Sequence, residues 1–136
     1  MSDRAFGDVE FGEDLPSIQP DTSLANVREF AKSSGMLAPR FTDHEGARKE
    51  GLPGAIVPGI MSQAIFAAVI HRWAANAELE KIDTVFRAPV LVDEPHTVTG
   101  VVTDLDDENG TVELDLTLQN EAGETRVLGT ATVKLP

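Results

Sequence analysis

A carboxylic acid and an imidazole stand side by side at Asp43 and His44, directly after the loop-like sequence SGMLAPRFT. Held together, these two groups can accept a proton from one atom and deliver it to another, which is general acid–base catalysis. The simpler interpretation is structural: Asp43 or Thr42 caps a short helix, with Glu45 in its first turn and Gly51 as its stop. Neighbouring residues on a helix also point in different directions, which would separate His44 from Asp43.

The remaining histidines offer weaker chemistry. His71 could line a tunnel, but beside Arg72 it is more simply a polar position late in a helix. His96 follows Pro95 and is expected in a surface turn. The sequence has no histidine cluster, no paired carboxylates at ligand spacing and no glycine-rich phosphate loop. It therefore predicts neither a metal site nor a nucleotide cofactor.

The composition narrows the class of protein. A chain of 136 residues suits one domain with one core, and we predict that residues 1–136 form it. The 23 acidic and 11 basic residues give a net charge of −12, which disfavours nucleic acid because a polyanion needs a basic face. Cysteine is absent, and no apolar run resembles a signal peptide or a membrane span. We therefore expect a cytoplasmic protein without disulfides.

Two segments predict substantial helices. In PDTSLANVREFAKSSG, cap residues precede apolar positions at helical spacing, and Gly35 stands where a left-handed helix end favours glycine. The segment GIMSQAIFAAVIHRWAANAELEK predicts the longest helix, over residues 59–81. This helix is apolar on most sides, so we expect it to be buried on most sides. Its small residues are expected to let it lie close to a sheet, namely Ala64, Ala67 and Ala68.

Four strands are predicted after this helix, in TVFRAPVLV, HTVTGVVTDL, TVELDLTLQN and TRVLGTATVKLP. The third alternates strictly between apolar and polar residues, which indicates one buried face. Asn109-Gly110 is a strong hairpin signal, and Gly123 supplies the next turn. We predict an antiparallel meander, extended by a further strand from the N-terminal region. One long buried helix wrapped by a curved antiparallel sheet is an α+β design, the hot-dog arrangement.

The loop and the start of the long helix resemble a known signature. The sequence FAKSSGMLAPRFTDHEGARKEGLPGAIVPGIM (residues 30–61) is similar to that of the MaoC-like dehydratases, the R-specific enoyl-CoA hydratase group of hot-dog proteins. The positions that match without a gap are Phe30, Ala31, Ser34, Gly35, Pro39, Asp43, Ala47, Gly51, Ile56 and Gly59. EFGEDLPSI and FRAPVLVDE also resemble the family's entry segment and the strand after its helix. The likeness covers nearly the whole chain and implies the hot-dog fold.

The sequence departs from this pattern at the positions where the family has its catalytic and other polar side chains. The family's catalytic Asp corresponds to Met36 and its catalytic His to Phe41. Its Asn falls on Ala38, and the His before the helix falls on Pro58. Hydration of an enoyl thioester needs a base for the water and a proton for the α-carbon, and Met and Phe supply neither. Because each positioned acid–base group contributes roughly 10²–10⁴ in rate, we expect the family's standard activity to be lost.

The resemblance implies that the parts of the family site without ionisable groups are retained in this sequence. It implies that the backbone N–H of Gly59 binds a thioester oxygen, and a helix N-terminus suits an oxyanion hole. A hydrophobic acyl slot is expected, with ordinary core packing as the alternative, from Met36, Leu37, Phe41, Ile60 and Met61. A basic side chain is expected to meet the phosphates of coenzyme A, first of all Arg40, with Arg48, Lys49, Arg72 and Arg87 as further candidates.

The resemblance favours a non-catalytic subunit of a larger enoyl-CoA hydratase. A second hot-dog subunit would supply the Asp and His, and this chain would accommodate an acyl-CoA or acyl-carrier thioester. Mixed complexes of this family act on bulky substrates, including steroid side-chain thioesters. One alternative is an active hydratase, dehydratase or related lyase or isomerase that uses Asp43, His44 or a water held by Gly59. The other is a homodimeric module that binds acyl thioesters or another hydrophobic ligand.

Overall fold

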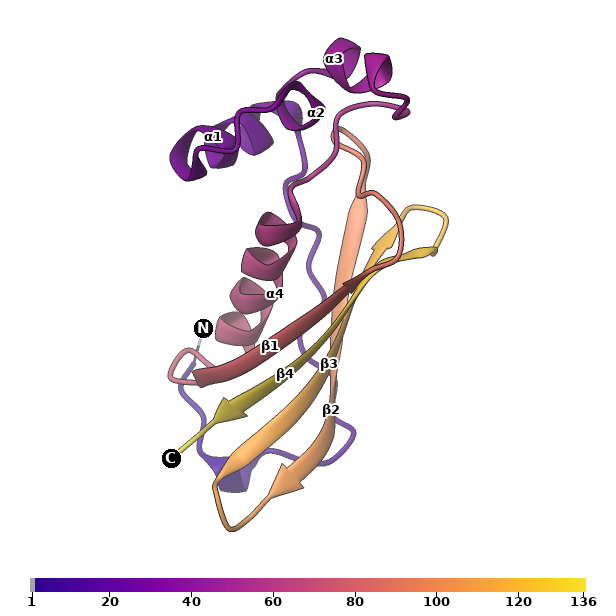
Figure 1. Ribbon diagram of the computed structural model, residues 1–136. Coiled ribbons are helices and arrows are strands. Elements are labelled where there is room, and N and C mark those ends of the chain that lie inside the picture. The colour runs from indigo at the N-terminus through magenta and orange to yellow at the C-terminus, as the bar shows by residue number, and fades with distance from the viewer. Residues whose placement is uncertain (1) are drawn as a thin grey trace.

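The computed structural model describes residues 2–136 (Figure 1). A short 3-10 helix, η1 (Phe6–Asp8), comes first. The helices are α1 (Leu24–Ser34), α2 (Pro39–Thr42), α3 (His44–Lys49) and α4 (Gly59–Trp73). The strands are β1 (Glu78–Phe86), β2 (His96–Asp106), β3 (Thr111–Asn120) and β4 (Thr125–Lys134). Within residues 2–136, none of the helices is long and apolar enough to cross a membrane.

The caps of α1 and α3 are those that the sequence predicts. The hydroxyl of Ser23 accepts a hydrogen bond from the Asn26 N–H at 3.3 Å, and Gly35 ends α1 with φ of 76°. The carboxylate of Asp43 accepts from the Gly46 N–H at 3.0 Å and so caps α3. Short polar side chains satisfy N–H groups that have no partner inside a helix. The helices α1 to α3 lie together beyond one end of the sheet, near the first turn of α4 (Figure 1).

The sheet has the strand order β1-β4-β3-β2, with every pair antiparallel. The consecutive strands β2, β3 and β4 form the predicted meander. The prediction was wrong for β1, which covers residues 78–86 instead of 84–92 and pairs with β4 instead of β2. The long helix correspondingly ends at Trp73 and not near residue 81. Pairing with β4 outweighs the helix propensity of the Ala, Glu and Lys residues in this stretch.

The N-terminal segment extends the sheet along β2, as predicted, although through isolated bridges and not as a regular strand. Asp14 pairs with Val101 and Ile18 with Val98. The Leu15 N–H also donates to the Gly100 carbonyl at 2.9 Å. These contacts cover the edge of β2. In the described part of the chain, no strand or bridge covers the opposite edge of the sheet, which is formed by β1.

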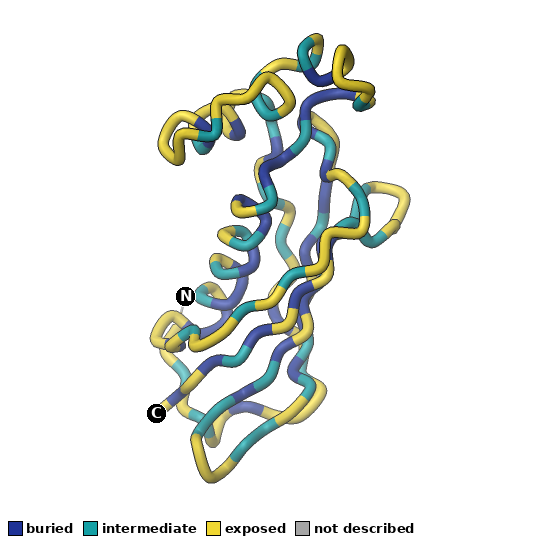
Figure 2. Tube along the Cα trace, viewed as in Figure 1, coloured by how far each residue is buried: buried dark blue, intermediate teal, exposed yellow. Residues whose placement is uncertain are grey.

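The helix α4 packs one face against the sheet and leaves the other exposed (Figures 1 and 2). Its buried residues are Met61, Ser62, Phe66, Val69, Ile70 and Trp73. Ala64 and Ala68 are exposed, so the prediction that small helix residues permit the close approach was wrong. The bulkier side chains face the sheet because they bury more apolar area there. The space for them comes from the sheet, since a Cβ at Gly129 would lie 2.8 Å from the Phe66 ring.

The N-terminal segment also contacts the C-terminal end of α4. The indole of Trp73 is 3 % exposed, and its Nε1–H donates to Glu13 Oε2 at 3.1 Å. The guanidinium of Arg4 lies 5.0 Å from the centre of the Trp73 ring and forms an ion pair with Glu13 at 3.0 Å. A desolvated cation over an aromatic ring is attractive, and the ion pair holds the cation in this position. These contacts fix residues 4–13 against the C-terminal end of α4.

Candidate functional site

A cavity of about 380 Å³ opens beside the first turn of α4. Three segments form it: the residues that enter α4, the first turn of the helix, and the end of β1 with the loop that follows. Its lining is largely apolar and consists of Ile56, Val57, Gly59, Ser62, Phe86, Arg87, Ala88, Pro89 and Val90. The wall is fixed by a hydrogen bond of 2.8 Å from the Val57 N–H to the Val90 carbonyl. A cavity of this kind suits an apolar ligand that carries few polar groups.

The first turn of α4 presents free backbone donors. Pro58 precedes the helix, and its carbonyl accepts from the N–H groups of Met61 at 3.0 Å and Ser62 at 3.3 Å. The N–H groups of Gly59 and Ile60 have no acceptor within residues 2–136. Unpaired N–H groups at the start of a helix attract an oxygen with partial negative charge. This end of the cavity can therefore bind a carbonyl oxygen.

Gly59 packs closely against the ring of Phe86. A Cβ at this residue would lie 3.0 Å from Cζ of Phe86. The ring of Phe86 belongs to the end of β1 and is 52 % exposed, so it forms a movable wall over the Gly59 backbone. The absence of a side chain at Gly59 keeps the backbone N–H accessible from the cavity.

Ser62 brings a polar side chain to the same cavity. The residue is 1 % exposed, and its Oγ has no hydrogen-bond partner in the described part of the chain. Buried hydroxyl groups normally have a partner, because an unpaired one loses its bonds to water without replacement. Ser62 is therefore exceptional among the side chains of the core.

Asp43 and His44 are adjacent in sequence but have separate partners. The Asp43 carboxylate caps α3. His44 Nε2 lies 2.8 Å from Asp93 Oδ2, and His44 Nδ1 accepts from the Ala55 N–H at 3.0 Å. Since Nδ1 is the acceptor, the hydrogen on Nε2 is donated to Asp93. Neither Asp43 nor His44 lines the cavity beside α4.

Asp93 accepts hydrogen bonds from two other segments of the chain. Its backbone has φ of 69°, an uncommon value for a residue other than glycine. Its Oδ1 accepts from the Leu24 N–H at 2.8 Å, while Oδ2 accepts from His44. The hydrogen bond from His44 and then the bond from Leu24 lower the pKa of the Asp93 carboxyl group. This arrangement ties α1 and α3 to the loop before β2, which is a structural role.

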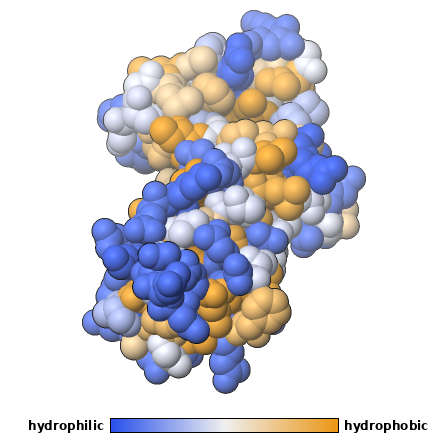
Figure 3. All heavy atoms as spheres, turned by 60° about the horizontal axis from the view of Figure 1, so that its bottom comes forward, coloured by the Kyte–Doolittle hydropathy of each residue, from blue (hydrophilic) through white to orange (hydrophobic). Residues whose placement is uncertain are grey.

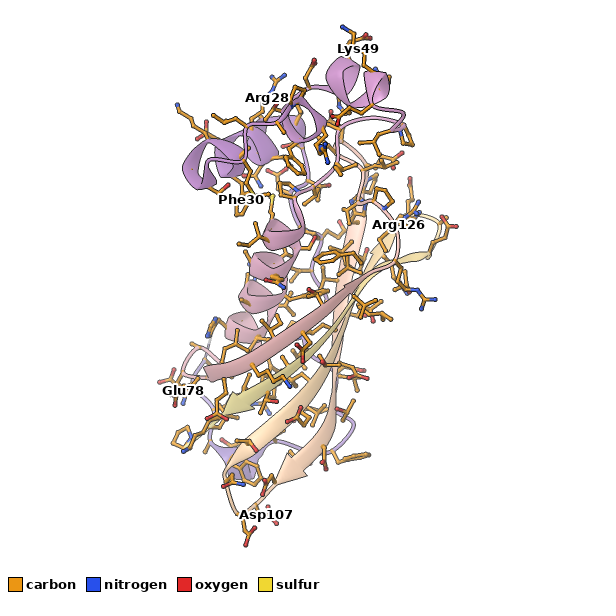
Figure 4. All side chains as sticks on the ribbon, in the orientation of Figure 1. Arg28, Phe30, Lys49, Glu78, Asp107 and Arg126 are labelled. Carbon is orange, nitrogen blue, oxygen red and sulfur yellow. The ribbon has the colours of Figure 1, made fainter. Side chains whose placement is uncertain are left out.

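The predicted binding residues divide between the cavity and its surroundings. Of the residues predicted for the oxyanion hole and the acyl slot, only Gly59 lines the cavity. Met61 is buried in the core, Ile60 is 56 % exposed, and Met36 and Phe41 are half-buried in the helical region beyond the sheet. Phe30 of α1 lies on the side that faces α4 (Figure 4). Arg40 forms an ion pair of 2.7 Å with Glu50.

Arg87 is a second predicted residue at the cavity, whereas the remaining lining residues were not predicted as part of the site. Arg87 was one of five candidates for a phosphate contact, and it now stands as an exposed cation at the cavity. Its backbone N–H donates to the carbonyl of Arg126, which lies near the end of β1 (Figure 4). The only sequence signal for Ser62 was its polarity in an apolar helix. Phe86 gave no signal, because its contact with Gly59 depends on how β1 crosses the sheet.

The two remaining histidines lie away from the cavity. His96 opens β2, as predicted, but the predicted surface position was wrong, since the residue is only 2 % exposed. Its Nδ1 lies 3.2 Å from the Thr22 hydroxyl, which itself donates to the Glu94 carbonyl. Burial lowers the pKa of His96 more than the nearby Glu94 raises it. His71 Nε2 lies 3.1 Å from the Ala77 carbonyl at the other end of α4. Residues 2–136 contain no group of three or more His, Asp or Glu residues that could hold a metal ion.

The buried face of α4 on the four-stranded antiparallel sheet defines a hot-dog protein, and the N-terminus of α4 has free backbone donors at the cavity. The family model of the MaoC like domain matches residues 12–123. The chain therefore belongs to the MaoC-like domain family, as the sequence signature predicted. No curated protein sequence matches the chain.

Solved structures share this fold. The (R)-hydratase from A. caviae involved in PHA biosynthesis superposes with a TM-score of 0.88 at 24% identity, over 94% of this chain and 98% of that one. The unliganded R-hydratase PhaJ1 from Pseudomonas aeruginosa gives 0.89 at 21% identity, over 97% and 85%. The ChsH1-ChsH2 complex from Mycobacterium tuberculosis gives 0.87 at 17% identity, over 94% and 99%. These similarities confirm the predicted α+β hot-dog fold.

Proposed function

We propose that this protein is a non-catalytic subunit that accommodates an acyl thioester within a heteromeric enoyl-CoA hydratase. One observation carries the proposal. The cavity beside α4 keeps the free N–H of Gly59 and an apolar lining, while the resemblance to the family signature aligns Met36 and Phe41 with its catalytic Asp and His. The site retains groups that bind a thioester and lacks the groups that hydrate it.

The chemistry of hydration supports this division of labour. A water molecule must lose a proton as it attacks the β-carbon, and a proton must reach the α-carbon of the enoyl group. Thioether and phenyl side chains exchange no protons, so neither Met36 nor Phe41 can replace a carboxylate or an imidazole. The free N–H groups at the start of α4 could still stabilise negative charge on the thioester oxygen. The proton transfers would come from a second subunit.

The sheet supports a hot-dog subunit as the partner. The unpaired edge of β1 ends in Val85 and Phe86, which are 61 % and 52 % exposed. Exposed edge strands with apolar residues favour pairing with another chain. Phe86 also lines the cavity, so a partner at this edge would complete the site. The similar ChsH1-ChsH2 structure is itself a complex of two named components. Bulky acyl chains, such as steroid side-chain thioesters, are the substrate class we propose.

The pairing of His44 with Asp93 favours one alternative function. An imidazole hydrogen-bonded to a carboxylate is an arrangement that enzymes use for proton transfer. The alternative is an enzyme that is active alone, with chemistry moved to Asp43 and His44. The same pair lies outside the cavity beside α4, which is why the subunit role is preferred.

Enoyl-CoA hydration tests both functions. The purified protein would be assayed with short, medium and bulky enoyl-CoA substrates, first alone and then co-expressed with hydratase-like subunits. We expect no turnover alone and turnover in a stable mixed complex. The controls are Asp43→Asn, which preserves the helix cap, and His44→Gln.

The outcomes separate the alternatives. Turnover by the protein alone that disappears in either variant would replace the subunit role with relocated catalysis. A homodimer that binds acyl-CoA saturably, with no activity in any mixture, would indicate a binding module.

A further inference from the structure

We infer that the hydroxyl group of Ser62 is a second hydrogen-bond donor to the ligand, acting beside the Gly59 N–H on one carbonyl oxygen. This inference rests on the proposed function and identifies the ligand atom that the site recognises. Ser62 would be a positioning residue for the thioester, not an acid or a base.

The first ground is the isolation of the Ser62 hydroxyl. The backbone N–H of Ser62 donates to the Pro58 carbonyl, but the side-chain Oγ has no partner within residues 2–136. Other buried polar side chains in the described chain do have partners. Thr22, for example, donates to the Glu94 carbonyl at 2.7 Å. A buried hydroxyl that lines a cavity without a partner is available to a ligand.

The second ground is the geometry of the first helical turn. Gly59 and Ser62 are three residues apart in α4, which places them on the same face of the helix. The Cα–Cβ bonds of a helix tilt toward its N-terminus, so the Ser62 side chain leans toward the turn that holds Gly59. Both residues line the same cavity. The hydroxyl and the N–H are therefore directed to one region of space.

The chemistry of this region selects the ligand group. The Gly59 N–H can only donate, and a carbonyl oxygen has two lone pairs that can accept one bond from each residue. The walls around the donors are apolar, formed by residues such as Ile56, Val57 and Val90. A bare anion would lose its hydration against these walls, and the one cation of the lining, Arg87, is exposed to water. A neutral carbonyl oxygen on an apolar chain meets every condition.

A pair of ligands that differ by this one atom tests the inference. Hexanoyl-coenzyme A carries the thioester carbonyl, and S-hexyl-coenzyme A has a CH₂ group in its place. Binding of both would be measured by calorimetry to the wild type, Ser62→Ala and Ser62→Thr. We expect Ser62→Ala to weaken binding of hexanoyl-coenzyme A by roughly fivefold, the value of one hydrogen bond, and to leave S-hexyl-coenzyme A unchanged. Ser62→Thr restores the hydroxyl and should retain the preference for the thioester.

Thermal unfolding of the ligand-free protein gives an independent readout. Because Ser62→Ala removes an unpaired hydroxyl, we expect its Tm to equal or exceed that of the wild type. A hydroxyl that served only the fold would instead give a lower Tm.

The failures of the two proposals are distinguishable. If the wild type binds both ligands and Ser62→Ala changes neither affinity, or changes both equally, the role of Ser62 is overturned and thioester binding stands. If the wild type binds neither ligand, alone or in the mixed complex, the proposed acyl-thioester function is overturned together with the ligand assigned to Ser62.

Discussion

Asp43 illustrates, at the scale of one residue, how a side chain suited to catalysis can serve the fold. Its carboxylate accepts a hydrogen bond from Gly46 and begins α3. Its neighbour His44 is held by Asp93 and Ala55. Local sequence rules predicted the cap, because a cap depends only on residues that follow within one turn.

We expect Asp43→Ala to lower the free energy of unfolding by about 1 kcal/mol, because the N-terminal turn of α3 loses its acceptor. Asp43→Asn should change it by only a few tenths of that amount, since the amide oxygen can cap the same N–H. Urea unfolding followed by circular dichroism would measure both. An equal loss in the two variants would show that the charge matters, and not the cap.

His96 gives the protein a defined sensitivity to acid. Burial lowers its pKa in the folded state, whereas the unfolded chain titrates near the ordinary value of about 6.5. Below that pH the unfolded chain binds a proton that the folded protein excludes, so stability is complete above about 6.5 and falls as the pH decreases. Glu94 opposes this shift, and Arg126 adds to it.

We expect His96→Gln to reduce the loss of stability between pH 7.5 and 5.5 relative to the wild type. The slope attributable to one group cannot exceed about 1.4 kcal/mol per pH unit. Urea unfolding at several pH values would measure the difference between the two proteins. Identical slopes would mean that folding does not change the pKa of His96.

Some residues of the candidate site could be predicted from the sequence, and others could not. Gly59 was predicted because the resemblance extends through the start of α4. Ser62 and Phe86 were not assigned to the site, and Arg87 was one of five phosphate candidates, because their proximity depends on β1 passing beside the first turn of the helix. No periodicity within either segment encodes that contact.

At the scale of elements, α4 and β4 meet where a glycine stands opposite a phenylalanine. Phe66 is fully buried, and its ring occupies the space above Gly129. Adding even one carbon to a well-packed core forces side chains or backbone to shift.

We expect Gly129→Ala to destabilise the protein by about 1–3 kcal/mol, because the new methyl group would overlap the Phe66 ring. The double variant Gly129→Ala with Phe66→Leu should lose less stability than the two single changes add up to, since the smaller side chain leaves room for the methyl group. Chemical unfolding of all four proteins completes the cycle. Simple additivity would show that the two residues do not compete for space.

The sequence predicted the elements that depend on neighbouring residues, and it did not predict those that depend on pairing between distant parts of the chain. The strands β2 to β4 follow from alternation and turn residues, and α1 from its caps and spacing. The end of α4 and the place of β1 depend on pairing between residues 78–86 and 127–134, far apart in sequence. The alanines of α4 misled the prediction because a helix apolar on most sides does not reveal which side meets the sheet.

At the scale of the whole molecule, the two edges of the sheet differ in whether another segment covers them. Residues 12–18 cover the edge at β2, and β1 stays open among the described residues. Apolar and hydrophilic residues lie side by side on the face shown in Figure 3. Exposed large apolar residues include Val85 and Phe86 at the open edge.

We expect Val85→Lys to prevent association with a partner subunit while leaving the fold intact, because an added charge at an edge strand opposes pairing with another chain. Thr99→Lys is the matched control, since Thr99 is an exposed residue of β2, the edge strand that the N-terminal segment covers. Co-purification and light scattering would measure the complex, and Tm the fold. Equal complex formation by both variants would place the interface elsewhere.

The position of Trp73 makes the protein its own optical reporter. The chain contains one tryptophan and no tyrosine, so its ultraviolet emission arises from this single indole. The indole contacts Glu13 and Arg4 at the C-terminal end of α4, whereas the cavity lies at the N-terminal end of the same 15-residue helix. A ligand in the cavity is too remote to touch the fluorophore. A change in emission on ligand addition would therefore register a displacement carried along the helix axis, and constant emission with bound ligand would show that the surroundings of Trp73 stay in place.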